Sequence, residues 1–145
     1  MTVDLPDLAA MTAFGARIAS RLEGGDVVSL EGGLGAGKTT LSRAILRALG
    51  HEGEVPSPTF TILETYDALT PPVIHADFYR LDTPGEAAEL GLAEYREGEV
   101  LLAEWPERAG GFRTDPNCLA VALEIRGAGR IAVVEGGLAW QRRMP

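Results

Sequence analysis

The feature that most constrains the fold is the glycine-rich segment GGLGAGKT at residues 32–39, which matches the pattern G-x-x-x-x-G-K-[ST]. It follows a short apolar run at residues 26–30 that predicts a buried strand. It precedes residues 38–49, whose apolar side chains recur at helical spacing and predict a helix. A strand, a glycine-rich loop and a helix in this order are typical of a phosphate-binding loop in an α/β domain.

Each residue type in this loop suits a phosphorylated ligand. Glycines let main-chain N–H groups approach phosphate oxygens without an obstructing Cβ, and a helix N-terminus adds a positive dipole end. Lys38 would reach the β- and γ-phosphates, and Thr39 would offer its hydroxyl to Mg²⁺. Lys38 is also the only lysine among thirteen basic residues. The alternative is a structural glycine-rich turn with an incidental lysine, and we favour phosphate binding.

A phosphate-binding loop of this kind is completed by a carboxylate at the end of a neighbouring strand, which positions Mg²⁺. Two residues qualify. Glu104 follows the fully apolar run 100–103, and Asp77 follows the less regular run 73–76. Each could instead be a solvated carboxylate at a strand end. The residues alone leave the choice between them open.

Three further residues have a structural interpretation that the sequence favours. His75 shares a strand face with Asp77, but His51 is the only other histidine, so His75 is interpreted as a hydrogen-bonded structural residue rather than a metal ligand. Trp105 is interpreted as a core residue. Thr59 is either a threonine that senses the γ-phosphate or the first residue of a strand, and the second interpretation is favoured.

The rest of the chain alternates between helical and extended patterns. Asp7 predicts the cap of a helix with an apolar face at Leu8, Met11, Gly15, Ile18 and Leu22. Segments 59–66 and 72–77 predict a hairpin, and residues 83–86 form a capping box that starts a helix ending near residue 91. Segments 119–126 and 130–135 predict two final strands. One α/β domain spanning residues 1–145 is expected.

Composition excludes several classes of protein. The net charge of −8 argues against a free-standing basic nucleic-acid binder. Cys118 is the only cysteine, so no internal disulfide is possible. The longest apolar run, residues 118–123, is far shorter than the roughly 20 residues that span a bilayer. No basic secretory region is visible at the start of the sequence, so a cytoplasmic location without membrane contact is expected.

Four blocks, taken together, resemble the bacterial TsaE (YjeE) family of the tRNA threonylcarbamoyladenosine pathway. They are GxLGAGKTT at 32–40, SPTFTILETY at 57–66, HADFYRL at 75–81 and LAEWPER at 102–108. The segment ELGLAEY at 89–95 fits between the last two. The resemblance covers nearly the whole chain, and the combination of the second pair of blocks is more specific than the phosphate-binding loop alone.

The resemblance implies a single-domain P-loop NTPase-like fold, with a mixed sheet that has a parallel core, antiparallel flanking strands and helices on its faces. It implies that Mg²⁺ is held by Thr39 and Glu104, and that Lys38 and Asp77 are catalytic. Thr59 and Trp105 become candidate sensors of the nucleotide state, and Arg130 matches a position near the adenine. The implied ATP-binding residues are Gly35, Ala36, Gly37, Lys38, Thr39, Thr40 and Arg130.

The family's activity, carried over to this chain, is a weak or partner-stimulated ATPase. It would act with the TsaB–TsaD pair in modifying adenosine 37 of tRNA, and would meet tRNA only through that complex. One departure is Gly33, where relatives usually carry Asp or Glu. Two alternatives remain: a P-loop small-molecule kinase, for which loop 108–113 is the only candidate lid, and a nucleotide-binding module that never hydrolyses its ligand.

Overall fold

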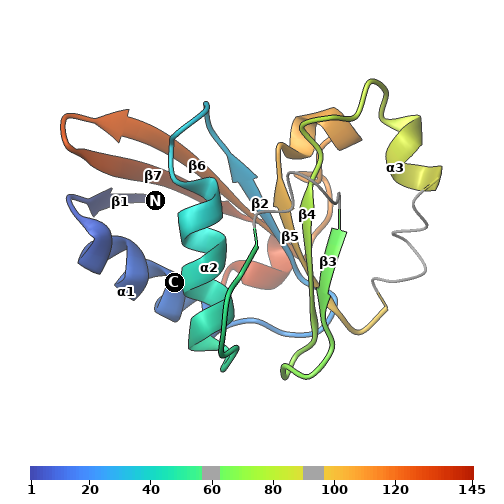
Figure 1. Ribbon diagram of the computed structural model, residues 1–145, viewed down its shortest axis with the longest axis horizontal. Helices are drawn as coiled ribbons and strands as arrows, with labels where there is room; N and C mark the ends of the chain where they lie inside the picture. Colours follow the sequence, from blue (N-terminus) through green and yellow to red (C-terminus); the bar gives the residue numbers. More distant parts are fainter. Residues whose placement is uncertain (57–62, 90–96) are drawn as a thin grey trace.

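The architecture is a seven-stranded mixed sheet with helices on both faces (Figure 1). The computed structural model describes residues 1–56, 63–89 and 97–145. The strand order across the sheet is β1-β7-β6-β2-β5-β4-β3. The elements are β1 (Thr2–Leu5), α1 (Leu8–Ala19), β2 (Val27–Glu31), α2 (Lys38–Ala48), β3 (Leu63–Tyr66), β4 (Val73–Asp77), α3 (Gly85–Glu89), β5 (Val100–Glu104), η1 (Pro106–Ala109), β6 (Cys118–Arg126), β7 (Gly129–Gly136) and η2 (Leu138–Trp140).

The centre of the sheet is parallel and its two margins are antiparallel. β2 lies between β5 and β6 and is parallel to both, and β4 continues the parallel set on the far side of β5. β7 and β1 add antiparallel strands at one margin, and β3 adds one at the other. The predicted α/β fold, with a parallel core and antiparallel flanking strands, is therefore confirmed.

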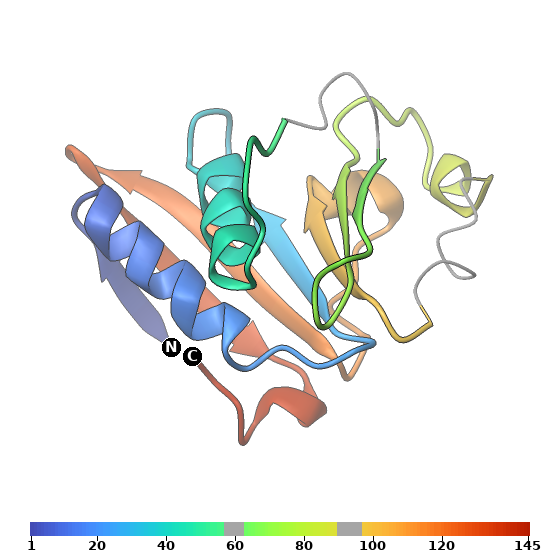
Figure 2. The same ribbon diagram turned by 60° about the horizontal axis from the view of Figure 1, so that its bottom comes forward.

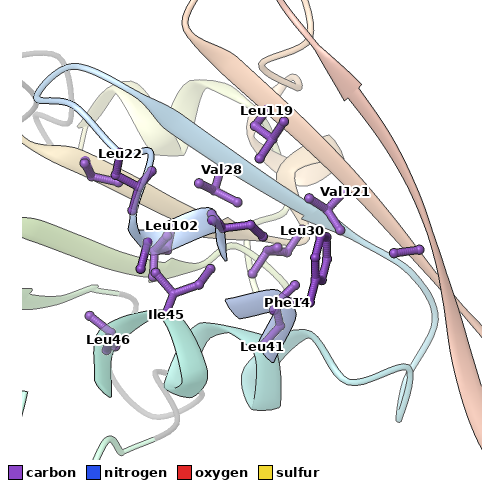
Figure 3. Packing of buried hydrophobic residues seen from close by; sticks show 14 of the residues in the cluster. Phe14, Leu22, Val28, Leu30, Leu41, Ile45, Leu46, Leu102, Leu119 and Val121 are labelled. Carbon is purple, nitrogen blue, oxygen red and sulfur yellow. The ribbon is translucent and has the colours of Figure 1, made fainter. Parts of the chain in front are cut away.

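Alternate residues of the central strands face two separate apolar clusters, as strand geometry requires. α1 and α2 pack side by side on one face (Figure 2), where Phe14, Leu41 and Ile45 contact the side of the sheet that carries Val28 and Leu102 (Figure 3). The opposite face carries a smaller cluster, to which α3 and the segment after β5 contribute. Both faces of β5 are covered, which explains its uninterrupted apolar sequence.

Local contacts close the ends of two helices, and the one at Asp7 is the cap that the sequence predicts. The Asp7 carboxylate accepts the Ala10 N–H at 2.9 Å and so caps α1. Gly50 follows α2 in a left-handed conformation, with φ of 107°. The N–H of the next residue, His51, donates to the carbonyl of Leu46 at 3.0 Å. These contacts satisfy main-chain groups that the helix ends leave unpaired.

Several details of the predicted elements were wrong. Leu8 is 73% exposed, whereas Phe14, which the helical pattern did not assign to the apolar face of α1, is fully buried. The strand β1 was not predicted, because Thr2–Leu5 is short and alternates only weakly. The predicted start of the first hairpin strand and the predicted end of the helix near residue 91 lie outside the described residues.

No helix in the three described ranges has the length and apolar character needed to cross a membrane.

Candidate functional site

The site lies where the carboxyl ends of three parallel strands meet. Leu30 of β2 and Asp77 of β4 are both register partners of Glu104 at the end of β5. Such an edge is where open α/β sheets bind their ligands. A cavity of about 320 Å³ opens there. Its lining residues are Leu34, Gly35, Gly37, Lys38, Thr39, Thr40, Asp77, Tyr79, Glu104 and Trp105.

The loop between β2 and α2 depends on glycine at two positions. Gly32 has φ of 141°, and a Cβ there would lie 2.5 Å from the carbonyl oxygen of Leu123. Gly37 has φ of 106° and forms the N-terminal boundary of α2. Both conformations are unfavourable for residues with a side chain. The loop geometry therefore follows from the sequence pattern, and it places main-chain groups at the start of a helix.

Lys38 is folded back onto its own loop. Its Nζ donates to the carbonyl oxygens of Gly32 at 2.7 Å and Gly33 at 2.8 Å. The same nitrogen lies 4.3 Å from the centre of the Trp105 ring, a cation–π distance. Burial lowers the pKa of Lys38, and the nearby carboxylates of Glu104 and Asp77 oppose that shift. The ammonium group is thus held at the cavity among weak acceptors.

Glu104 is almost completely buried, with 2% of its surface exposed, and both of its carboxylate oxygens have side-chain partners. Oε1 accepts a hydrogen bond from the Thr39 hydroxyl at 2.7 Å. Oε2 lies 2.5 Å from Nε2 of His75. The last residue of β5 and the second residue of α2 are therefore joined directly, across 65 residues of sequence.

Asp77 occupies a more open position beside Glu104. Its Oδ1 accepts the N–H of Tyr79 at 2.9 Å. Burial raises the pKa of the Asp77 carboxyl, while the Tyr79 hydrogen bond opposes the shift and the nearby Glu104 carboxylate adds to it. A carboxyl group with a raised pKa in a cavity beside a lysine is typical of a functional site.

Trp105 has φ of 54°, the only positive φ at a non-glycine residue in the described part of the chain. This left-handed conformation turns the ring toward Lys38 and places it 4.9 Å from the ring of Tyr79. The guanidinium of Arg108 lies 5.1 Å from the other ring centre, that of Tyr79. The interpretation of Trp105 as a core residue is incomplete, because its half-buried ring also lines the cavity.

Arg130 reaches the loop from the start of β7. Its Nε donates to the carbonyl of Ala36 at 3.1 Å and its Nη2 to that of Gly35 at 2.9 Å. A second cavity of about 140 Å³ lies beside it and shares Gly37 and Thr40 with the first. The remaining lining residues of the second cavity are Leu5, Asp7, Leu8, Met11, Ala128, Gly129 and Arg130.

The structure therefore brings the sequence-predicted residues to one region. Ala36, a residue of the loop itself, is 2% exposed, and Arg130 lines the adjoining cavity. Thr59 lies outside the described residues. His51 contacts the Glu54 carbonyl and the Tyr66 ring, whereas His75 contacts Glu104, so the two histidines have separate partners. Tyr79 was assigned no role from the sequence, although its place two residues after Asp77, within HADFYRL, was the available signal.

The donor set suits magnesium better than a softer metal. Among the described residues, no group of three or more His, Cys, Asp and Glu side chains is arranged to hold a metal ion. Thr39 and Glu104 instead offer two adjacent oxygen atoms. Mg²⁺ prefers oxygen ligands and is usually bound by one or two carboxylates together with phosphates and water. The residues present therefore fit a Mg²⁺ ion that arrives with a phosphorylated ligand.

Comparisons with known proteins agree on one family. The family model described as "Threonylcarbamoyl adenosine biosynthesis protein TsaE" matches residues 5–131. The tRNA threonylcarbamoyladenosine biosynthesis protein TsaE of Haemophilus influenzae is 38% identical over 125 residues, covering 82% of this chain and 79% of the relative. Its counterpart from Synechocystis is 43% identical over 109 residues, covering 72% of this chain and 69% of the relative.

The fold agrees with the sequence comparisons. The crystal structure of Bacillus subtilis YdiB has a TM-score of 0.79 to this structure and 28% sequence identity, covering 98% of this chain and 89% of that one. The family match, the identity to curated relatives and the shared fold all point the same way. This chain belongs to the TsaE family of tRNA threonylcarbamoyladenosine biosynthesis proteins.

Proposed function

We propose that this protein binds and hydrolyses ATP with Mg²⁺, and that it does so as the ATPase component of the tRNA threonylcarbamoyladenosine machinery. The observation that carries the proposal is the grouping of Lys38, Thr39, Asp77 and Glu104 around one cavity at the phosphate-binding loop. Each of these four side chains has the chemistry that one part of nucleotide hydrolysis requires.

The loop and Lys38 bind the phosphates in this proposal. Main-chain N–H groups of residues 35–40 surround the phosphate oxygens, and the N-terminus of α2 contributes its dipole. Lys38 exchanges the carbonyls of Gly32 and Gly33 for phosphate oxygens, which are stronger acceptors because they carry charge. Arg130 holds the loop through the carbonyls of Gly35 and Ala36, and the cavity beside Arg130 would receive the adenine base of ATP.

Two residues would hold the metal and a third would handle the proton. Thr39 and Glu104 would hold Mg²⁺, which when bound neutralises charge on the phosphates. Oδ1 of Asp77 is held by the Tyr79 N–H, which leaves Oδ2 to orient water and accept its proton. The raised pKa of Asp77 favours that acceptance, because it makes the carboxylate a stronger base.

The alternative of a small-molecule kinase finds less support. A kinase of this type needs an arginine-bearing lid that closes over the phosphates, and loop 108–113 is the candidate that the sequence offers. Arg108 lies over the Tyr79 ring, and Arg113 bonds to Glu31 and Glu135. Both arginines are therefore engaged in contacts that a closing lid would have to break.

The proposed partner role rests on charge and family membership. Curated relatives are named as tRNA threonylcarbamoyladenosine biosynthesis proteins. A chain with net charge −8 is poorly suited to bind the phosphates of tRNA by itself. We therefore propose that it acts with the TsaB–TsaD pair and meets tRNA only through that complex.

The test is ATP turnover by the purified protein, alone and with the matching TsaB–TsaD pair. Stimulation by the pair is expected, and Lys38→Ala should abolish it. Arg142→Ala is the matched control, because it removes one positive charge from an exposed position near the C-terminus. Equal turnover with and without the pair would contradict the partner role. Phosphate transfer to an added acceptor instead of water would favour the kinase.

A further inference from the structure

His75 is a buried polar residue that the proposed function leaves without a role. It lies on β4, two residues before Asp77, and has no measurable exposure. Its backbone is the register partner of Leu102 in β5. From there the imidazole reaches across to the neighbouring strand end, where Nε2 lies 2.5 Å from Oε2 of Glu104. A fully buried polar ring that touches one carboxylate calls for an explanation beyond packing.

The surroundings of the ring select one tautomer. Nδ1 is buried and has no hydrogen-bond partner within the described ranges. An orphaned N–H donor in a protein interior is rarer than an under-satisfied acceptor. The neutral ring therefore carries its proton on Nε2 and donates it to Glu104, while Nδ1 keeps an unshared lone pair.

This hydrogen bond restricts the carboxylate that faces the phosphate-binding loop. A free glutamate side chain samples several rotamers, and fixing it in one of them costs conformational entropy. In this structure Oε2 is occupied by His75, so Oε1 is directed at the Thr39 hydroxyl, 2.7 Å away. The two oxygens that would hold Mg²⁺ are thereby kept adjacent before any ligand arrives.

We infer that His75 is a positioning residue for the divalent cation that accompanies the nucleotide, acting through Glu104 and not by ligating the metal. The inference rests on the proposed function, since it concerns the same metal site. Partners of ligating carboxylates and histidines commonly tune metal affinity in this way, by about 10- to 100-fold. Mg²⁺ itself prefers oxygen, so the imidazole is better suited to hold the ligand than to replace it.

The test compares ATP affinity with Mg²⁺ and with EDTA, by calorimetry, in three proteins. His75→Phe keeps a ring but removes the donor, and should reduce the Mg²⁺ enhancement of ATP affinity by about 10-fold. It should leave affinity in EDTA nearly unchanged. His75→Gln places an amide N–H near the Nε2 position and should restore most of the enhancement. The ratio of the ATP affinity in Mg²⁺ to that in EDTA falls if His75 positions the metal site, and stays constant if the substitution only disturbs the structure.

Three outcomes are decisive against the inference. His75→Phe with the wild-type enhancement would overturn it alone, while the proposed function stands. Equal weakening in Mg²⁺ and EDTA would show that His75 is merely structural. If the wild-type protein binds ATP equally tightly in Mg²⁺ and in EDTA, both the inference and the proposed metal site are overturned.

A second measurement does not depend on the variants folding. The chain has two histidines, so ¹⁵N NMR of the unmodified protein, with His51→Gln for assignment, reports each ring separately. The neutral Nε2–H tautomer is expected for His75. The Nδ1–H tautomer would overturn the inference, because the ring could not then donate to Glu104.

Discussion

Glu104 and Asp77 end neighbouring parallel strands and are partners in register, yet they stand in different surroundings. Glu104 is 2% exposed, with one oxygen facing Thr39 and the other facing His75. Asp77 is only half-buried, borders the cavity and is held through a backbone N–H. The enclosed carboxylate is fixed in place, whereas the open one is accessible to a ligand. Equivalent positions at a sheet edge thus provide two different environments for a carboxylate.

The difference follows from what lies beside each strand. β5 is flanked by β2 and β4, so the end of β5 is surrounded by the start of α2 and by the His75 ring. β4 has the marginal strand β3 on its other side, and the chain turns away after Asp77 toward Tyr79. A central strand therefore encloses its terminal side chain more completely than a strand near the margin does.

The largest effect is expected from Asp77→Asn. The change keeps the shape of the side chain but removes its ability to accept a proton. If Asp77 acts as the base, ATP turnover should fall by about 10²- to 10⁴-fold, because that is the usual contribution of such a group. ATP affinity in Mg²⁺ should change little, which calorimetry can check. Unchanged turnover would show that Asp77 is not the base. The accessible carboxylate would then have no catalytic role to contrast with that of the enclosed Glu104.

The next effect is on stability and should distinguish the two carboxylates directly. Glu104→Ala removes the acceptor of the Thr39 hydroxyl and of His75, both in a buried location. Leaving buried donors unpaired costs about 1–3 kcal/mol each, so the free energy of unfolding should fall by at least that amount. Asp77→Ala is the matched control and should cost less than about 0.5 kcal/mol. Equal losses in urea denaturation would contradict the comparison.

Sequence reasoning reached the parts of this site that depend on local pattern. The loop at 32–39, the helix after it and the cap at Asp7 all follow from residue types at fixed spacing. The two strand-end carboxylates were also recognisable, since each follows an apolar run. Choosing between them required the family resemblance, because their different enclosure arises from strand order, which residue spacing does not reveal.

Other features depend on contacts between distant segments. Arg130 bonds to the carbonyl of Gly35 across 95 residues, and its hydrogen-bonding role had no local signal. The left-handed conformation of Trp105 is equally invisible in the sequence, since tryptophan rarely adopts it. Phe14 was missed because the apolar face of α1 was assigned to a set of positions that included Leu8 and left Phe14 out. The predicted face was therefore rotated about the helix axis relative to the face that packs on the sheet.

Two neighbouring glycines of the loop also differ in enclosure, Gly32 being enclosed and Gly33 open, and a smaller effect on stability is expected there. A Cβ at Gly33 would meet nothing within 4 Å, and its φ lies outside the left-handed range. Gly33→Ala should therefore raise the free energy of unfolding by about 0.4–1 kcal/mol, since it restricts the unfolded chain. The Cβ of an acidic residue there would fit equally well.

Gly32→Ala is the control for that change and should act in the opposite direction. Its Cβ would lie 2.5 Å from the Leu123 carbonyl oxygen, in a conformation that disfavours side chains. Urea denaturation of both variants tests the contrast. A loss of stability in Gly33→Ala would show that the position is constrained by something other than the surrounding atoms.

The smallest effect expected is a dependence of stability on pH that belongs to Asp77. Burial raises its pKa in the folded protein above the ordinary 3.8, so the folded state holds the Asp77 proton more tightly than the unfolded state does. The resulting stabilisation is complete below about pH 3.8 and is lost as pH rises through the folded value. Above that value, the partly buried charge opposes folding. Half-exposure keeps the effect modest, because solvent screens the charge.

Asp77→Asn removes this titration and isolates it. The free energy of unfolding of the variant, minus that of the wild type, should increase from about pH 4 toward neutrality and then level off, because only the wild type acquires the charge. Other titrating groups contribute to both proteins and largely cancel in the difference. A difference that stays constant with pH would mean that Asp77 is as well solvated as a surface carboxylate. Asp77 would then be more accessible to solvent than its place in the cavity implies, and its carboxylate would be no stronger a base than one in water.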